Sequence, residues 1–552
     1  MDASPSHGST LADQQSAQWT ATATVLARIW RRLLGVPRIG LDDDFFALGG
    51  DSFRASRLAV EAGRLFGVDL PVTLAFDRPR LRGQAAWIDS TAGAAAATAD
   101  PPHAPDAPDA PDAPDAPAGG PGPGQRLTTQ QWEFLDWMAA TDPPRDPGTV
   151  CTALRLHEPF DPELLRQALD AVTRRHSPLR TAFRATPTGR LSPSTTAHRP
   201  PVVEVVDAQG ETPQERERHA AELARAARDL APELPHDPLV RALAVRLAPD
   251  DWVVVLAVHH FVFDGWSLGV LLRELGLRYS ALQTGDRDPL PPLTLDHEAY
   301  CDWTAQQWTL NRPYWQRTLH GAPRALEPFP GRREAHRFSR RRHPLTLAAP
   351  LWARFRERVA ATGGTAFMGA ATCWTAVLHE WTGADDIVLM SPVPGRTLPE
   401  HDALIGCLVQ SLLIRVDTSG RPDFAALLER VRTAALDAAR HQFHAYHETA
   451  LQVPYPARIH YESWGGTPFF PGLRSEAFAL PREQQSLDWP TPNGEPDLST
   501  PELIAEERPD GTLEAAVVHN HHAFDGATAA ALAEAFRAHV EAVAHGQEPA
   551  RA

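Results

Sequence analysis

A low-complexity segment at residues 96–124 divides the 552-residue chain, so the parts on either side of it must fold separately. The segment repeats Pro-Asp-Ala and ends in alternating glycine and proline from Gly119 to Gly124. This composition cannot bury enough apolar surface to build a core, which predicts an extended spacer with a flexible glycine end. At about 3.1 Å per residue, such a spacer reaches up to about 80 Å.

The part before the spacer has the pattern of a small all-α bundle. Residues 1–17 are polar, and we expect them to be disordered. Apolar residues at helical spacing in residues 18–95 predict helices over Ala21–Leu34 and Ser52–Phe66, with a shorter one near Leu81–Ile88.

The part after the spacer alternates helical and strand patterns. Helices are predicted over Pro162–His176 and Thr365–Trp381, and strands over Val253–Val258 and Leu408–Val416. This alternation predicts an α/β architecture from residue 125 to the C-terminus.

Two histidines follow the apolar strand at Val253–Val258, in the run His259-His260-Phe261-Val262-Phe263-Asp264-Gly265. Leucines at helical spacing follow the run, so the imidazoles lie where a strand ends and a turn begins, a usual place for catalytic side chains. A histidine there can accept a proton near neutral pH. Adjacent side chains on a strand point to opposite faces, so only one of the two can face a substrate if the strand continues through both.

A second motif, Leu48-Gly49-Gly50-Asp51-Ser52, immediately precedes the helical run that begins at Ser52. The N–H groups and the dipole at a helix N-terminus favour a phosphodiester on this serine. Alternatively, Ser52 serves only as the N-cap of the helix.

These motifs together resemble a peptidyl carrier protein followed by a condensation domain of a nonribosomal peptide synthetase. HHxxxDG at His259–Gly265 resembles the condensation active-site motif, and LGGDS at Leu48–Ser52 resembles the carrier attachment site. Other stretches before and after His259 also resemble condensation motifs and stand in the family's order along the chain. In the last of them, Gln410 stands in place of the usual asparagine. These stretches are Thr128–Trp132, Arg175–Phe183, Tyr300–Trp303, Tyr314–Trp315, Gly395–Arg396 and Ile405–Arg415.

The resemblance implies a four-helix carrier bundle and two chloramphenicol-acetyltransferase-like lobes with a tunnel between them. The domains would be a disordered N-terminus, a carrier, a linker, an N-lobe and a C-lobe, at residues 1–17, 18–95, 96–124, 125–310 and 311–552.

The resemblance also assigns roles within the condensation motif. His260 would face the substrates, with His259 packed or hydrogen-bonded behind it. Asp264 would be structural and pair with Arg415, while Gly265 would keep the acceptor channel open. His260 can act as a general base, orient the acceptor amine or stabilise charge, and the sequence leaves these roles open.

In the carrier, Ser52 beside Asp51 would carry covalent 4′-phosphopantetheine. The implied reaction transfers an acyl or peptidyl group from this thioester to an acceptor amine on a carrier protein or a small molecule, forming an amide. Implied partners are a phosphopantetheinyl transferase and an adenylation domain or upstream module. Ester formation and a non-catalytic carrier-binding platform remain as alternatives.

A second histidine pair, in His521-His522-Ala523-Phe524-Asp525-Gly526, has a spacer that is one residue shorter. We interpret it as a histidine-rich turn before an ordinary amphipathic helix over Ala527–Ala542. A metal site built from His519, His521, His522 and Asp525 is the alternative. We otherwise predict no metal.

The composition limits the partners and the cellular compartment that we expect for this chain. The net charge of −16 argues against nucleic acid or an anionic membrane as a partner, and no apolar run approaches the 18 residues of a membrane span. The four cysteines form neither a disulfide framework nor a metal pattern, which favours the cytoplasm. All 53 basic residues are arginine, which suggests a high-GC bacterial genome and leaves no lysine to act as a base.

Overall fold

The computed structural model describes residues 19–98, 126–139, 148–185, 191–196, 198, 200–229, 238–462, 470–480, 488–491 and 495–548. These residues form two compact units, one on each side of the predicted spacer. The predicted disordered N-terminus, residues 1–17, and all but the first three residues of the predicted spacer lie outside the described residues.

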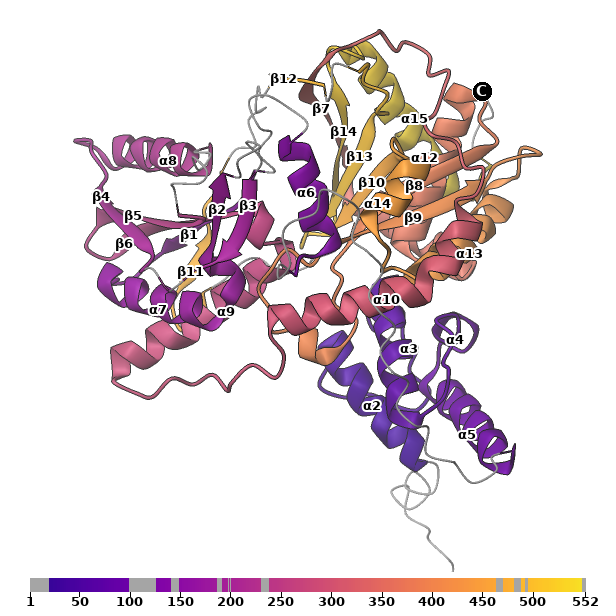
Figure 1. Cartoon of the computed structure of the whole chain (residues 1–552), viewed down its shortest axis with the longest axis horizontal. Coiled ribbons are helices and arrows are strands. Elements are labelled where there is room, and N and C mark those ends of the chain that lie inside the picture. The colour runs from indigo at the N-terminus through magenta and orange to yellow at the C-terminus, as the bar shows by residue number, and fades with distance from the viewer. Residues whose placement is uncertain are drawn as a thin grey trace, which may run out of the picture. The chain divides into compact units, whose positions relative to one another are not determined.

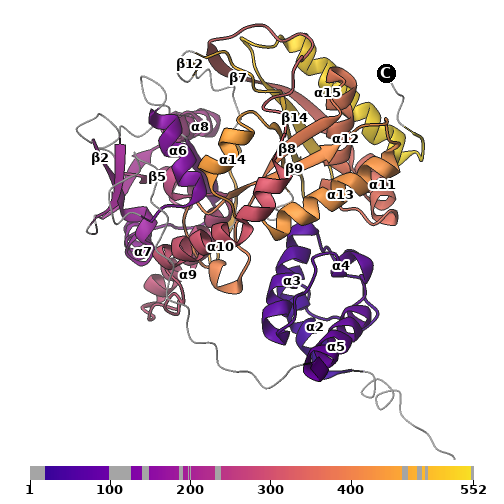
Figure 2. The same ribbon diagram turned by 45° about the vertical axis from the view of Figure 1, so that its right-hand side comes forward.

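The first unit contains four helices within its described residues: α2 (Ala21–Leu34), α3 (Ser52–Phe66), α4 (Leu74–Asp77) and α5 (Leu81–Thr98). Figure 2 shows α2, α3 and α5 as the longer helices of the bundle, with the short α4 beside α3. The bounds of α2 and α3 are those predicted from the apolar spacing. Helix α5 is longer than predicted and extends into residues 96–98, because the alanine-rich run after Ile88 has high helix propensity.

The second unit begins with a five-stranded sheet in the order β11-β1-β6-β5-β4. Its strands are β1 (Thr149–Leu156), β4 (Val202–Asp207), β5 (Val240–Ala248), β6 (Asp251–His259) and β11 (Ser475–Ala477). Strand β6 lies between β1 and β5, and from Trp252 to His259 every residue is buried, as its valine-rich sequence predicts. The strand that leads to the histidine pair is therefore held on both edges.

Helices cover both faces of this sheet (Figure 1). Helix α7 (Pro162–Arg175) and helix α9 (Gly265–Thr284) share one apolar core, while α8 (Pro213–Asp229) packs Ala220 and Ala224 against the opposite face. The remaining elements of this half are short: α6 (Thr129–Ala139), η1 (Ser177–Arg180), the hairpin β2 (Thr181–Ala185) and β3 (Leu191–Thr195), and η2 (His260–Val262).

A seven-stranded mixed sheet follows, in the order β12-β7-β14-β13-β10-β8-β9. Its strands are β7 (Arg337–Leu347), β8 (Asp386–Val393), β9 (Gln410–Asp417), β10 (Ala457–Glu462), β12 (Asp488–Pro490), β13 (Glu502–Glu507) and β14 (Leu513–Asn520). Helices α11 (Ala349–Ala361), α12 (Ala366–Thr382), α13 (Phe424–Arg440) and α15 (Gly526–Ala544) contact one another and form a layer on this sheet. Two short elements complete this half: η3 (Pro399–His401) and α14 (Tyr446–Gln452).

The two sheets are linked by more than one chain segment. Helix α10 (His297–Thr318) runs between them and spans the predicted lobe boundary at residues 310–311. Strand β11 comes from the later half of the sequence but pairs with β1, through Leu154–Ala477 and its neighbours, and so completes the five-stranded sheet. The C-terminal half thus contributes to both sheets.

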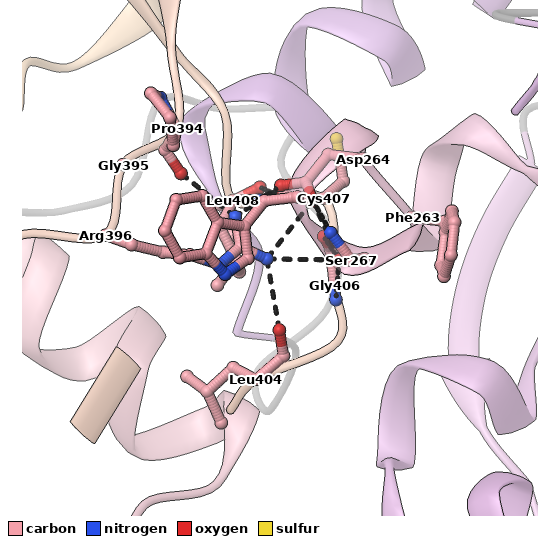
Figure 3. A network of polar contacts seen from close by, with 12 residues as sticks. Phe263, Asp264, Ser267, Pro394, Gly395, Arg396, Leu404, Gly406, Cys407 and Leu408 are labelled. Atoms are coloured by element: carbon pink, nitrogen blue, oxygen red, sulfur yellow. Dashed lines mark hydrogen bonds and ion pairs between the residues drawn. The ribbon is translucent and has the colours of Figure 1, made fainter. Parts of the chain in front are cut away.

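A buried ion pair, which we call the Asp264–Arg396 clamp, also joins the two halves (Figure 3). Asp264 precedes α9 in the first half, and Arg396 follows β8 in the second. Two guanidinium nitrogens of Arg396 donate to Asp264, over 2.8 Å to Oδ2 and 3.1 Å to Oδ1. Arg396 is 0% exposed and Asp264 is 3% exposed, so neither charge is compensated by water.

The predicted pairing of Asp264 with Arg415 is wrong. Arg415 lies on β9, where its Nε and Nη2 bind the carboxylate of Asp386 at the start of the adjacent strand β8. Its Nη1 donates to the carbonyl oxygens of Thr318 and His320. These neighbours hold the Arg415 side chain at the far end of β9 from Gln410, whereas Arg396 lies in the loop that reaches Asp264.

We expect Arg396→Gln to lower the free energy of unfolding by about 3–5 kcal/mol, because it leaves the Asp264 carboxylate buried and unpaired. Arg415→Gln, which breaks a partly exposed pair, should cost clearly less. Urea unfolding of both variants measures the two effects.

The double variant Asp264→Asn/Arg396→Gln should be more stable than the sum of the two single losses predicts, since it removes both charges. Equal losses for Arg396→Gln and Arg415→Gln would show that the clamp does not hold the two halves together.

Candidate active site and carrier attachment site

The histidine motif lies in a tight turn between β6 and α9. Strand β6 ends at His259, His260 starts the short η2 turn, and Asp264 caps α9. The His260 N–H donates to the carbonyl of Gly148 over 2.8 Å, which ties the turn to the residue before β1. The turn is therefore fixed at its start by β1 and at its end by the clamp.

His259 is packed behind the turn, as predicted. It is buried, its Nδ1 accepts the N–H of Phe261 over 3.2 Å, and its ring lies against Phe183. Strand alternation is not what separates the two histidine side chains. The strand ends at His259, and the η2 turn gives His260 a different direction.

His260 is half-buried, and one of its ring nitrogens is committed to the backbone. Nδ1 lies 2.7 Å from the carbonyl oxygen of Phe263. A carbonyl oxygen only accepts, so Nδ1 carries the proton and Nε2 keeps a lone pair. Among the described residues, no side chain or backbone group donates to Nε2. The ring is flanked by Phe134 at 5.2 Å between centroids, and by Cys407, whose Sγ lies 4.0 Å from Nδ1.

These surroundings favour a neutral imidazole. Burial lowers the pKa of His260 below its ordinary value, and this effect outweighs the backbone hydrogen bonds and the charge of Asp264, which raise it. At neutral pH the ring therefore presents an unprotonated Nε2. A group of this kind can accept a proton or a hydrogen bond from a reacting amine.

Asp264 is saturated with hydrogen bonds and has no role left for proton transfer. Besides Arg396, its carboxylate accepts from the N–H and Oγ of Ser267 and from the N–H of Leu408. Burial alone would raise the pKa of Asp264, but the charge and hydrogen bonds of Arg396 hold it below its usual value. Asp264 is thus an ionised structural group, which agrees with its predicted structural role.

Arg396 is the residue that the sequence prediction missed. Its guanidinium also donates to Ser267 Oγ, to Pro394 O and to Leu404 O, as Figure 3 shows for several of these contacts. The signal was present, because Gly395 and Arg396 stand together in one of the matched motifs. Gly395 has φ +67°, and a Cβ there would lie 2.0 Å from the Leu408 carbonyl oxygen, so only glycine allows this approach.

Residues of the other matched motifs meet around the same turn. Gln131 Nε2 donates to Phe261 O over 2.9 Å, and Thr128 Oγ1 donates to Cys407 O over 2.8 Å. Tyr300 Oη donates to Gly395 O over 2.8 Å. Segments far apart in the sequence therefore converge on the backbone on either side of the clamp.

Gly265 and Gln410 are two further positions that the motifs single out. Gly265 is exposed, and a Cβ there would meet nothing within 4 Å, which is consistent with open space beside the turn. Gln410, which replaces the usual asparagine, is buried; its Nε2 donates to Leu408 O, while its Oε1 has no hydrogen-bond partner in the described part of the chain.

In the first unit, Asp51 rather than Ser52 is the N-cap of α3. The Asp51 carboxylate accepts the N–H of Arg54 over 2.7 Å and also pairs with its guanidinium. Ser52 is then the first helical residue, and it is half-buried. Since Asp51 supplies the cap, capping does not explain the serine.

The loop before Ser52 needs its glycines. Gly49 has φ +92°, and a Cβ on Gly50 would lie 2.3 Å from the ring of the buried Phe45. The loop therefore brings the Ser52 hydroxyl to the first turn of a 15-residue helix, where N–H groups and the dipole favour a phosphodiester. These residues fit an attached phosphopantetheine.

The second histidine motif shares the aspartate helix cap of the first but lacks its environment. Asp525 caps α15 by accepting from Thr528 N and Oγ1, as Asp264 does from Ser267. Asp525 is exposed, however, and no arginine clamps it among the described residues. Nor do the described residues contain three histidine, cysteine or acidic side chains grouped for a metal, so the alternative of a metal site in this motif has no support.

Within the described part of the chain, no helix is long and apolar enough to cross a membrane.

Comparison with known families matches both units. The condensation domain family matches residues 149–456, and the phosphopantetheine attachment site family matches residues 24–88. The order of carrier and condensation domain is the one expected from the motifs, and the matched carrier region includes Ser52.

The related proteins are peptide synthetases. A linear gramicidin synthase of Brevibacillus parabrevis is 29% identical over 76% of this chain and 8% of its own length. The phosphinothricin tripeptide synthetase PhsC of Streptomyces viridochromogenes is 35% identical over 56% of this chain and 29% of its own length. A probable non-canonical synthetase of Salinispora arenicola, CymA, is 29% identical over 96% of this chain and 7% of its own length. The chain thus spans a small part of the relatives it matches.

Solved structures confirm the fold. The X-domain from teicoplanin biosynthesis has a TM-score of 0.63 at 22% identity, covering 77% of this chain and 96% of that one. SgcC5 of Streptomyces globisporus has a TM-score of 0.61 at 21% identity, covering 76% of this chain and 99% of that one.

With the family matches and the motifs in agreement, the chain belongs to the condensation-domain family of nonribosomal peptide synthetases and carries a phosphopantetheine carrier domain ahead of its condensation domain.

Proposed function

We propose that this chain catalyses amide-bond formation, transferring an acyl or peptidyl group from a thioester on Ser52 to an acceptor amine. The observation that carries the proposal is the neutral His260 ring, whose Nδ1–H is held by Phe263 O while Nε2 is left to accept. A protein that only bound carriers would have no need of this arrangement.

The phosphopantetheine arm, when attached, supplies a flexible thioester that activates the acyl group. The residues of this chain then act on the acceptor. As the C–N bond forms and the C–S bond breaks, His260 Nε2 takes the proton released by the amine and returns it to the leaving thiolate. The hydrogen bond to Phe263 O orients the ring, and the clamp holds the turn on which the ring is carried.

The proposal also includes the domain boundaries expected from the motifs. In it, the linker at residues 96–124 tethers the carrier to the condensation domain. A tether of this kind raises the effective concentration of the carrier at a nearby acceptor enzyme toward the mM range. We infer four kinds of partner. They are the acyl or peptidyl donor, the acceptor carrier or amine, the phosphopantetheinyl transferase that modifies Ser52, and the adenylation domain or upstream module that loads the arm. We place the reaction in the cytoplasm because the four cysteines form neither a disulfide framework nor a metal pattern.

Ser52→Ala should abolish pantetheinylation, because the hydroxyl that forms the phosphodiester is gone. Intact-protein mass spectrometry after incubation with coenzyme A and a broad-specificity phosphopantetheinyl transferase measures it. The wild-type chain should gain one arm, on the order of 340 Da. Ser56→Ala, one turn further along α3, serves as the control and should gain the same mass. A gain retained in Ser52→Ala would place the attachment elsewhere.

His260→Gln should reduce product formation by about 10²–10⁴-fold, because an amide accepts a hydrogen bond but cannot take up a proton. The assay uses wild-type and variant chains loaded with the same acyl group and offered a panel of aminoacyl carriers, free amines and alcohols, with products identified by mass spectrometry. His522→Gln, in the second histidine pair, is the matched control and should keep full activity.

The outcomes separate the alternatives. Activity in His260→Gln within about tenfold of wild type would show that the residue orients the amine rather than acting as a base. Ester products from the alcohols would identify the second reaction. Failure of the loaded wild-type chain to turn over any acceptor, with its fold intact, would favour a carrier-binding platform.

A further inference from the structure

A basic cavity lies at the end of β14, in the second half of the condensation domain. Its volume is about 470 Å³, within the range of small-molecule sites. Neither His260 nor Asp264 lines it, so it is separate from the proposed active site. Its lining residues are Arg333, Arg341, Arg342, His343, His519, His521, Phe524, Asp525 and Gly526.

The lining is rich in basic side chains, in a chain whose net charge is −16. Three arginines and three histidines face a single carboxylate, that of Asp525. The Asp525 carboxylate is engaged at the N-terminus of α15, where its Oδ1 accepts from Thr528 N over 2.8 Å and from Thr528 Oγ1 over 2.9 Å. The balance of charge in the cavity therefore favours an anion.

The strand register places two of these basic groups directly opposite each other. His519 on β14 is the partner of Arg341 on β7, so their side chains project from the same face of the sheet. Like charges in this position repel unless the histidine stays neutral or an anion lies between them. Burial lowers the pKa of His519, and the nearby His521 and His343 lower it further, so the ring is neutral at neutral pH and does not repel Arg341.

His519 also has an unused polar atom. It is 5% exposed, and its Nδ1 has no hydrogen-bond partner within the described residues. A buried polar atom without a partner is costly, and a ligand in the cavity can supply one. The backbone around the site is fixed, since Arg333 Nη2 donates to His521 O over 3.0 Å and Arg333 N donates to Ala523 O over 2.8 Å.

We propose that this cavity binds a small molecule bearing a phosphate or pyrophosphate group, held by Arg341, Arg333 and His519 at the start of α15. Guanidinium groups bind phosphate oxygens with paired, charge-assisted hydrogen bonds. The N-terminus of the 19-residue helix α15 favours the same charge. Phe524 gives the cavity an apolar wall against which an organic group of a phosphate ester can pack.

Isothermal titration calorimetry of the full chain with inorganic pyrophosphate and with ADP tests the site without any thioester chemistry. Arg341→Gln and Arg333→Gln should each weaken binding by at least about tenfold, since each removes a charged donor. Arg340→Gln is the matched control: this neighbour on β7 pairs with Glu502, does not line the cavity, and should leave affinity within about twofold.

Tighter binding of ADP than of pyrophosphate would support a phosphate ester as the ligand, and the reverse order would support an inorganic anion. Two results would overturn the proposal. One is the absence of binding by the folded wild-type chain at mM ligand. The other is equal affinity in wild type, Arg341→Gln, Arg333→Gln and Arg340→Gln. Because condensation activity is not measured, failure here leaves the proposed function untouched.

Discussion

The buried pair of Asp264 and Arg396 is the interaction on which the geometry of the candidate active site depends. Both charges are removed from water, which is costly unless every polar atom finds a partner. Asp264 meets this condition through Ser267, Leu408 and Arg396, and it also caps α9. One carboxylate therefore fixes the start of a helix, the loop after β8 and the segment that leads into β9.

The second histidine motif shows what that environment adds to a common local fold. In both motifs a buried strand leads to two histidines, an aspartate N-cap, a glycine and a hydroxyl residue that returns a hydrogen bond to the cap. At Asp264 the cap is buried under an arginine from another segment, whereas at Asp525 it stays exposed beside a basic cavity. The same type of helix cap is thus buried in an ion pair in one half and exposed beside a basic cavity in the other.

The local elements were largely predictable because they depend on neighbours in sequence. The bounds of α2 and α3 follow from apolar spacing. The packed position of His259 was implied by the resemblance, because strand alternation alone did not say which histidine faces the substrate. The partner of Asp264 was not predictable in the same way. Arg396 and Arg415 both stand in motif regions, and only the path of the loop after β8, made possible by Gly395, decides which one reaches the carboxylate. Nor did the sequence reveal that β11 crosses to the other sheet, since three residues carry too little pattern.

Burial keeps His260 neutral although a carboxylate stands four residues away in the sequence. The charge of Asp264 raises the pKa of His260, while burial lowers it. If Asp264 stood alone, its field in a buried site would favour the imidazolium, which has no lone pair to offer an amine. Arg396 opposes that field, since two of its guanidinium nitrogens donate to the same carboxylate. Burial is the largest influence on the pKa of His260 and lowers it despite the nearby carboxylate. The proposed catalytic base and the carboxylate of the structural ion pair thus stand at the two ends of one short turn, His260 to Asp264.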